Sequence, residues 1–345
     1  MLNSQEFSLL NVRTENVLKF LIEDYIGTKS PVSSTSIAKT IFPKTSSATI
    51  RNDMSKLEQY GYITRPHISS GGIPLSKGYR QYVNKLDDFL VPQEDEMHQI
   101  REIFSNINDD VEEIIRETAK LLSVICDNLT IITFPKSEIT KLRHLELVSI
   151  NEYSIFLVII DSNLMVKKEL IKSKTFVAKE ELIKISNKLN GLFEGKTKDS
   201  IYIGNLDGLE KELGEKIIDV LTILDSEQTE YEINGLLRLI AQPEFSEIEK
   251  KNVIIEMIEG DKDLLTQIFS QNIDNNTLDV TIGSENKESK LHDLSLLKMS
   301  YGLEDAFLGS LAIIGPTRMT YIRIIGVLRV VSELMRNRIG FLLRV

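Results

Sequence analysis

The chain has 345 residues, a net charge of −10 and a hydrophobic fraction of 42%, which is ordinary for a globular protein of two or three domains. Its one cysteine, Cys126, excludes a disulfide framework, and its four histidines are too far apart for a histidine-built metal centre. The longest apolar run, Ile155–Ile160, is far shorter than the roughly 18 residues of a membrane span. The N-terminus lacks the pattern of a secretory signal, so we expect a cytoplasmic protein.

Charge is distributed unevenly along the chain. Residues 1–90 contain 11 basic and 8 acidic side chains, whereas residues 91–345 contain 30 and 43. Within residues 29–85 there are nine basic side chains and only two acidic ones. This asymmetry predicts a basic, nucleic-acid-binding module joined to an acidic body.

The first 90 residues favour three helices followed by a β-hairpin. Apolar spacing predicts a helix over 12–26, and capping serines with proline breaks predict a second over 33–41. A third helix begins at the Thr-Ser-Ser cap of 45–47 and ends before Gly61. Two short β-type stretches then flank a Ser- and Gly-rich loop over 67–72. This order predicts a winged helix-turn-helix domain over residues 1–90.

The remainder favours an α/β body interrupted by a helical insertion. Helical spacing covers 95–129 and 178–194, and strand-like runs lie between them at 144–173. The acidic stretch 207–271 is expected to be mostly helical. Strands are expected again at 278–282, 294–300 and 310–314, before a closing helix at 319–343. The fold class is therefore α+β with several domains.

The third helix has the most informative side chains. Ile50, Met54 and Leu57 share one face, which we expect to be buried. Arginine can bond guanine and asparagine can bond adenine through paired hydrogen bonds, while Ser, Thr and Lys suit the phosphate backbone. The alternative is an ordinary solvated helix face. The predicted DNA contacts from this helix are Ser46, Ser47, Thr49, Arg51, Asn52, Ser55 and Lys56.

The hairpin that follows is basic around a small, flexible tip. Such a loop can lie along a groove or a phosphate backbone, although it could also be a surface loop with incidental charge. Tyr79 and Tyr82 are expected to pack the hairpin onto the body rather than to stack on bases. The predicted DNA contacts from this region are Arg65, His67, Ser69, Ser70, Lys77 and Arg80.

Two segments resemble the HrcA family, the heat-inducible transcription repressors of bacteria. The family pattern SSATIRNDMxxLExxGxL, followed by PHTSAGRxPTxxGYRxYVD, is similar to residues 46–61 and 65–83. A second family pattern, GPTRMxY, matches residues 315–321. The chain departs from the pattern at Ile68, Gly72 and Leu75, where the family commonly has Thr, Arg and Thr.

The resemblance implies a fold, a function and partners. The fold would be a winged-helix domain (1–90) and a GAF-like domain (91–205 and 275–345) with an inserted dimerisation domain (206–274). The function would be repression of chaperone genes by a homodimer bound to an inverted-repeat DNA operator, with a two-fold arrangement of recognition helices. Activity would be supported by chaperonin and lost on heat stress. The alternative is a regulator whose GAF-like domain senses a small molecule.

Other candidate sites are weaker. Arg318 could contact a phosphate or ligand, but a structural turn in which it bonds an acidic neighbour or carbonyls is the favoured interpretation. The basic closing helix could touch a membrane, but its apolar positions favour a core-facing stripe. The sequence contains no P-loop, GxGxxG, HExxH or GxSxG motif. We therefore predict no enzyme, no catalytic residues, no cofactor and no metal.

Overall fold

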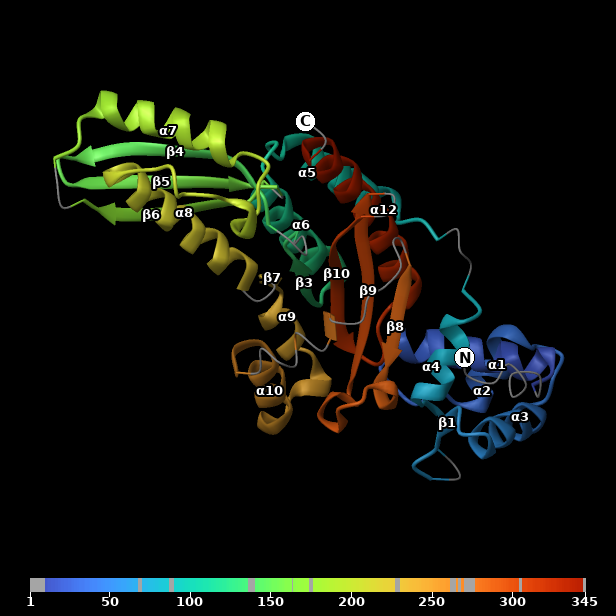
Figure 1. Ribbon diagram of the computed structural model, residues 1–345. Helices are drawn as coiled ribbons and strands as arrows, with labels where there is room; N and C mark the ends of the chain where they lie inside the picture. The colour runs from blue at the N-terminus through green and yellow to red at the C-terminus, as the bar shows by residue number, and fades with distance from the viewer. Residues whose placement is uncertain are drawn as a thin grey trace.

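The computed structural model describes residues 10–67, 70–86, 90–135, 140–162, 164–173, 176–226, 230–260, 265, 268–269, 277–303 and 306–343. Ser69 and Ile68, two positions of the predicted hairpin tip, lie outside this set. The fold is mixed α/β, with a small N-terminal unit at one end, a central sheet and a separate three-stranded sheet at the other end (Figure 1).

The N-terminal unit, residues 10–86, contains the three predicted helices and the hairpin. Its strands form an antiparallel pair in which Ile63 lies opposite Pro74. Asn11, Ser33 and Ser46 cap the three helices by accepting a backbone N–H from the first turn. The elements are α1 (Val12–Thr28), α2 (Ser34–Ile41), α3 (Ser47–Gln59), β1 (Ile63–Thr64), β2 (Ile73–Pro74) and α4 (Ser76–Val83).

The body, residues 90–135 and 230–343, is built on a five-stranded antiparallel sheet with the order β7-β3-β10-β9-β8. Its strands are β3 (Leu129–Thr133), β7 (Tyr231–Asn234), β8 (Leu278–Ile282), β9 (Leu294–Leu303) and β10 (Ala306–Pro316). Its helices are α5 (Glu94–Asn106), α6 (Val111–Cys126), α9 (Leu236–Ile240), α10 (Ile248–Ile255) and α12 (Tyr321–Leu343). Short helical turns are η3 (Pro243–Phe245), η4 (Glu256–Gly260), η5 (Gly283–Glu285) and η6 (Ser289–Leu291).

Both faces of the central sheet are covered. Side chains alternate along a strand, so Ile132 and Ile313 pack with α5, α6 and α12, whereas Ile131 and Ile314 pack with α9 and α10. The apolar stripe of α12 is buried, as the core-facing interpretation predicts. Within the described part of the chain, no helix combines the length and apolar character needed to cross a membrane.

The three-stranded unit, residues 142–226, has a core of its own. Strands β4 (Leu142–Asn151), β5 (Ser154–Asp161) and β6 (Val166–Lys172) form a meander. Helices α7 (Lys179–Phe193) and α8 (Gly208–Ser226), with the short turn η2 (Lys198–Ser200) between them, supply the rest of the unit.

This division differs from the predicted boundary at 206–274. The predicted GAF-like domain, 91–205 and 275–345, includes the strands over 142–172, but in the structure these strands form a sheet of their own. Conversely, β7 lies in the stretch expected to be helical, and it completes the central sheet beside β3. The reason is physical: alternation shows that a strand has one buried face, but not which strand it pairs with.

Candidate nucleic-acid interface

Helix α3 presents the two faces that its sequence predicts. Ile50, Met54 and Leu57 are at most 2% exposed and pack against the rest of the N-terminal unit. The opposite side is solvent-exposed and carries small or polar side chains at Ala48, Arg51, Asn52, Ser55, Lys56 and Gln59. The geometry therefore presents hydrogen-bond donors along one accessible helix face.

The start of α3 is held by its cap. The Ser46 hydroxyl accepts a hydrogen bond from the Thr49 N–H at 3.2 Å, and the two hydroxyls are 2.9 Å apart. Ser46 is exposed, whereas Ser47 and Thr49 are half-buried. The two hydroxyls of the cap are thus already hydrogen-bonded to each other, and their first role is to fix where the helix begins.

A buried carboxylate anchors α3 to α1. Asp53 is 1% exposed and accepts hydrogen bonds from Arg13 Nε at 2.7 Å, Arg13 Nη2 at 3.2 Å and the Thr14 hydroxyl at 3.2 Å. Sequence reasoning missed this support. The available signal was the helix position itself, because Asp53 lies beside Met54 on the apolar side and a buried carboxylate needs donors.

Arg65 supports α3 rather than pointing to solvent. Its guanidinium donates to Glu58 Oε2 from Nε at 2.9 Å and to the Ser55 hydroxyl at 3.2 Å. Its side chain is only 10% exposed. The same Ser55 hydroxyl donates to the Arg51 carbonyl at 3.0 Å. Of the predicted contacts, Arg65 and Ser55 therefore form an internal brace between α3 and the hairpin.

Three predicted contacts remain at least partly accessible, two at the hairpin tip and one, Lys77, on the first turn of α4. His67 and Lys77 are exposed and Ser70 is half-buried, with the Ser70 N–H bonded to the His67 carbonyl at 2.9 Å. The Lys77 ammonium lies 4.9 Å from the centroid of the Tyr62 ring, a cation–π distance. Ser69, the remaining predicted contact at the tip, lies outside the described residues.

Gly72 occupies the position of the usual family arginine, and it is buried. Its N–H and carbonyl exchange hydrogen bonds with Val32 at 2.8 and 3.0 Å. A Cβ on Gly72 would lie 2.8 Å from Leu21 Cδ1 and 3.1 Å from Met54 Cε. In this chain a side chain at position 72 would enter the core rather than reach a phosphate.

Arg80 belongs to a different surface from the other predicted contacts. Its Nε donates to Glu285 Oε1 at 2.7 Å, and its Nη2 donates to the second Glu285 oxygen and to the Val280 carbonyl. The hydrogen bond to Glu285 raises the pKa of Arg80 above its usual range. Arg80 thus links α4 to the body instead of lying beside Arg51 and Lys56.

Arg318 fulfils the structural alternative predicted for it. The guanidinium is 11% exposed and bonds both carboxylate oxygens of Glu244, one at 2.7 Å, and the Gln242 side chain at 3.1 Å. Burial is the largest single effect and works to raise the pKa of Glu244, but the hydrogen bond from Arg318, a backbone hydrogen bond and the positive charges of Arg318 and Lys29 together hold the pKa below its usual range. The second sequence motif is therefore a braced turn.

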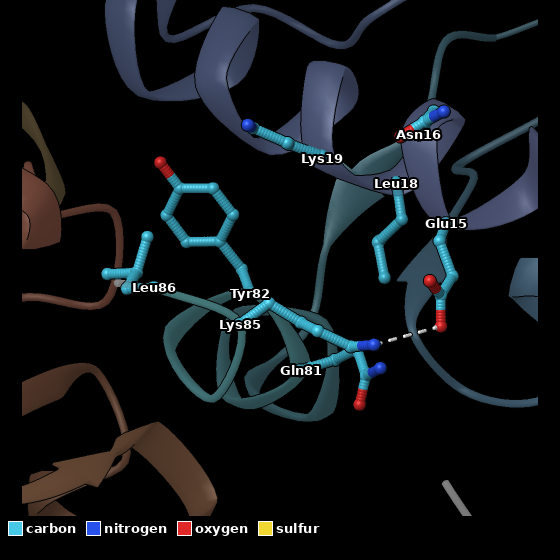
Figure 2. Close-up of a pocket in the computed structure, with 8 residues that line it drawn as sticks. All are labelled: Glu15, Asn16, Leu18, Lys19, Gln81, Tyr82, Lys85 and Leu86. Carbon is cyan, nitrogen blue, oxygen red and sulfur yellow. Dashed lines mark ion pairs between the residues drawn. The ribbon is translucent and has the colours of Figure 1, made fainter. Parts of the chain in front are cut away.

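The N-terminal unit also has a small pocket between α1 and the end of α4 (Figure 2). Its cavity volume is about 160 Å³, and an ion pair between Glu15 and Lys85 at 3.5 Å crosses its lining. The buried Gln81 side chain contributes an Oε1 atom that has no hydrogen-bond partner among the residues the structure describes. Among the described residues, no cluster of His, Cys, Asp and Glu side chains could hold a metal ion.

The comparisons with known proteins place this architecture in a class of regulators. A family model described as the HrcA protein C-terminal domain matches residues 112–325. A relative from Dehalococcoides mccartyi, strain 195, is 34% identical over 96% of both chains, and one from Clostridioides difficile is 30% identical over 95% of this chain and 99% of its own. Both carry the name heat-inducible transcription repressor HrcA.

The chain belongs to the HrcA family. A crystal structure described only as a hypothetical protein has the same fold, with a TM-score of 0.67 and 24% identity over 96% of this chain and 98% of that one. The family model begins within α6, whereas the full-length relatives also cover the N-terminal unit that carries α3.

Proposed function

We propose that this chain represses heat-shock genes by binding DNA through its N-terminal unit, which we assign as a winged helix-turn-helix domain. The observation that carries the proposal is the exposed face of α3. In the part of the chain that the structure describes, the side chains of Arg51, Asn52 and Lys56 make no hydrogen bond or ion pair with another protein group. These donors are available to an external partner, while Asp53 and Arg65 hold the helix that carries them.

Helix α3 would enter the major groove, where Arg51 and Asn52 can each make two hydrogen bonds to a base edge. Lys56, the hairpin residues His67 and Ser70, and Lys77 on the first turn of α4 would contact phosphates, which position the protein without reading sequence. The net charge of +7 over residues 29–85 supplies the attraction to the DNA backbone.

We assign the body as the GAF-like domain and the three-stranded unit as the inserted dimerisation domain. The chain leaves the central sheet after β3 and returns to it at β7, where Thr130 pairs with Asn234. Between these two strands, most of the described apolar side chains from Leu142 to Leu224 form the three-stranded unit with its own core. The proposed insertion therefore covers about residues 142–226.

The three-stranded unit offers a surface for a second copy of the chain. One face of its sheet is covered by α7 and α8. The other, which we call the open sheet face, carries a row in which Val148 pairs with Phe156 and Phe156 with Leu170. Val148, Ile150 and Leu170 are 42%, 57% and 54% exposed. An apolar patch of this kind marks an association site, and a two-fold dimer would cover it.

Chaperonin dependence is the third part of the proposal. The central sheet is assembled from distant segments, since Ile132 pairs with Leu311 across the whole three-stranded unit. Such pairing forms slowly and leaves strand edges exposed during folding. We expect chaperonin to raise the fraction of refolded chain that binds DNA, as measured by titration with operator DNA. Full recovery without chaperonin, and DNA binding unchanged through the stress temperature, would contradict this part.

The test of DNA binding is selection of bound sequences from a random pool of duplex DNA. The expected motif is an inverted repeat, and Arg51→Ala should relax the selected base at one position in each half-site. Arg238→Ala is the matched control, because Arg238 is 43% exposed on α9 of the body and forms an ion pair with Asp127. Selection of no motif, or an identical motif with the Arg51→Ala variant, would refute the assignment of α3.

A further inference from the structure

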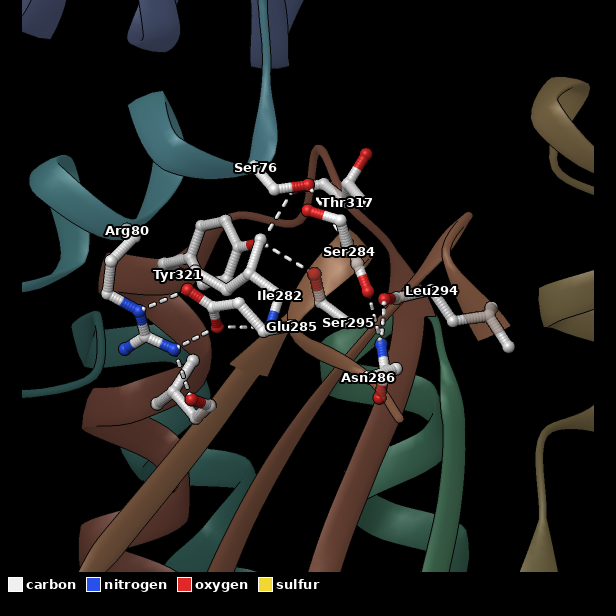
Figure 3. A network of polar contacts seen from close by, with 12 residues as sticks. Ser76, Arg80, Ile282, Ser284, Glu285, Asn286, Leu294, Ser295, Thr317 and Tyr321 are labelled. Atoms are coloured by element: carbon white, nitrogen blue, oxygen red, sulfur yellow. Dashed lines mark hydrogen bonds and ion pairs between the residues drawn. The ribbon is translucent and has the colours of Figure 1, made fainter. Parts of the chain in front are cut away.

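Helix α4 connects the N-terminal unit to the body through a compact polar network (Figure 3). Arg80 engages both oxygens of Glu285, and Glu285 Oε2 also accepts the Ile282 N–H at 2.8 Å. Beside this pair, the Ser284 N–H donates to the Ser76 hydroxyl at 3.1 Å. The ion pair is partly shielded, with Arg80 25% and Glu285 32% exposed. Partial burial and paired bonds make the contact directional.

An aromatic contact lies next to the ion pair. Tyr79 of α4 and Tyr321 of α12 are at most 1% exposed, and their ring centroids are 5.8 Å apart. The Tyr321 hydroxyl donates to the Thr317 carbonyl at 2.6 Å and lies 2.8 Å from the Ser295 hydroxyl. These bonds fix Tyr321 within the body, so it offers Tyr79 a rigid surface.

The approach of the two parts depends on a glycine. Gly283 has a φ of +52°, and a Cβ at this position would collide with the Ser76 hydroxyl and lie 3.1 Å from Thr317 Cγ2. Glycine tolerates this backbone conformation and leaves room for α4. The contact is therefore a built surface in which Tyr79 meets Tyr321, Arg80 meets Glu285, and Ser76 meets Ser284.

The start of α4 is also hydrogen-bonded, through Tyr62, to the recognition helix α3. The Leu75 N–H, at the start of α4, donates to the Tyr62 carbonyl at 3.0 Å, and the Tyr62 N–H donates to the Leu57 carbonyl of α3 at 2.9 Å. A short chain of backbone hydrogen bonds thus connects α3 to the helix that contacts the body. Any rotation of α4 on the body would carry α3 with it.

We propose that this junction, formed by Ser76, Tyr79 and Arg80 against Gly283–Glu285, Thr317 and Tyr321, sets the half-site spacing that the repressor accepts. The inference rests on the proposed function, in which two recognition helices of a dimer read two half-sites. Fixing α3 relative to the body fixes the separation of those helices, and half-sites must then match it. Without the junction, α4 would lose its polar anchor on the body and the separation of the two recognition helices would vary more. The second recognition helix would then have a lower effective concentration at its half-site, but the dimer would accept a wider range of spacings.

The test compares full-length wild type with Arg80→Glu, Glu285→Arg and the double charge swap. Each binds the selected half-site alone and a series of inverted repeats whose spacer changes by single base pairs over one helical turn. We expect wild type to favour one spacing, and each single variant to lose roughly tenfold at that spacing while its dependence on spacing flattens. The double swap restores the ion pair but not the bonds to Val280 and Ile282, so it should recover part of the preference. Half-site affinity should stay constant throughout.

Two further variants keep the test decisive. Arg80→Lys and Glu285→Gln remove the paired hydrogen bonds without reversing charge, and they should flatten the spacing profile in the same direction if the reversals fail to fold. Lys120→Glu is the control, because Lys120 is 50% exposed on α6 and pairs with its neighbour Glu117. A wild-type spacing profile in the folded single variants would overturn the inference, and so would a loss of half-site affinity. Failure of wild type to bind any selected half-site would instead refute the proposed function.

Discussion

Gly72 makes the family pattern and the tertiary structure predict opposite results. By resemblance, Gly72→Arg restores the usual arginine of the hairpin and should add a DNA contact. By structure, even the first carbon of the new side chain meets Leu21 Cδ1 at 2.8 Å, Ile63 Cδ1 at 3.1 Å and Met54 Cε at 3.1 Å. All three atoms belong to the packed core of the N-terminal unit. We therefore expect Gly72→Arg to destabilise this unit and to weaken DNA binding.

The magnitudes follow from which atoms would have to move. Gly72→Ala meets only side-chain ends and should cost about 1–2 kcal/mol. Gly71→Ala should cost about 2–3 kcal/mol, since its Cβ would lie 2.5 Å from the Pro31 carbonyl atoms, which are backbone. Gly72→Arg should cost more than either, because a charged group would also be placed against apolar side chains. Gly27→Ala is the matched control: nothing lies within 4 Å, and removing a helical glycine should stabilise by about 0.5–1 kcal/mol.

Hydrogen exchange in the full-length chain measures these effects where they occur. Amides of α1 and α3 report the local opening free energy, and a loss of about 1.4 kcal/mol appears as a tenfold loss of protection. From most to least protected, the expected order is Gly27→Ala, wild type, Gly72→Ala, Gly71→Ala and Gly72→Arg. Unchanged protection of α1 and α3 in Gly72→Arg, together with tighter DNA binding, would show that position 72 faces DNA and not the core.

Three more predictions concern DNA reading, assembly and the single thiol. Arg51→Ala should weaken binding to the selected site by about 1–3 kcal/mol. Lys56→Ala should weaken binding to all sequences alike and reduce the slope of log affinity against log salt concentration by about one. Equal losses on every sequence for both variants would contradict the base-reading role of Arg51. Leu170→Lys should dissociate the proposed dimer in sedimentation experiments by placing a charge on the open sheet face, while Ile183→Lys, 47% exposed on α7, should not. A dimer that survives Leu170→Lys would place the interface elsewhere. Burial raises the pKa of Cys126 to about 12. The native thiol should therefore be protonated and resist alkylation at pH 8 until the chain is unfolded. Rapid labelling of the native protein would show that α6 opens readily.

Local sequence was sufficient for the first three helices and the hairpin of the N-terminal unit, and for the two faces of α3. A helix repeats every 3.6 residues, so the spacing of apolar and polar residues within one short segment is enough to predict its two faces. The buried residues of α3 are Ile50, Met54 and Leu57, and the exposed ones include Arg51, Asn52 and Lys56. The caps at Ser33 and Ser46 were predictable for the same reason, since a cap bonds a backbone N–H only three residues away.

Long-range pairing decided what the sequence left open. Arg65 and Arg80 look alike as basic residues of a hairpin region, yet one braces α3 through Glu58 and the other reaches Glu285, which is 205 residues away. The strands over 142–172 have clear alternation, but only folding in three dimensions placed them in a separate sheet and brought β7 beside β3. A pattern of burial and charge specifies what kind of partner a side chain or strand requires. Which distant residue supplies that partner is determined by the packing of the whole chain, because many arginines and strands satisfy the same local rule.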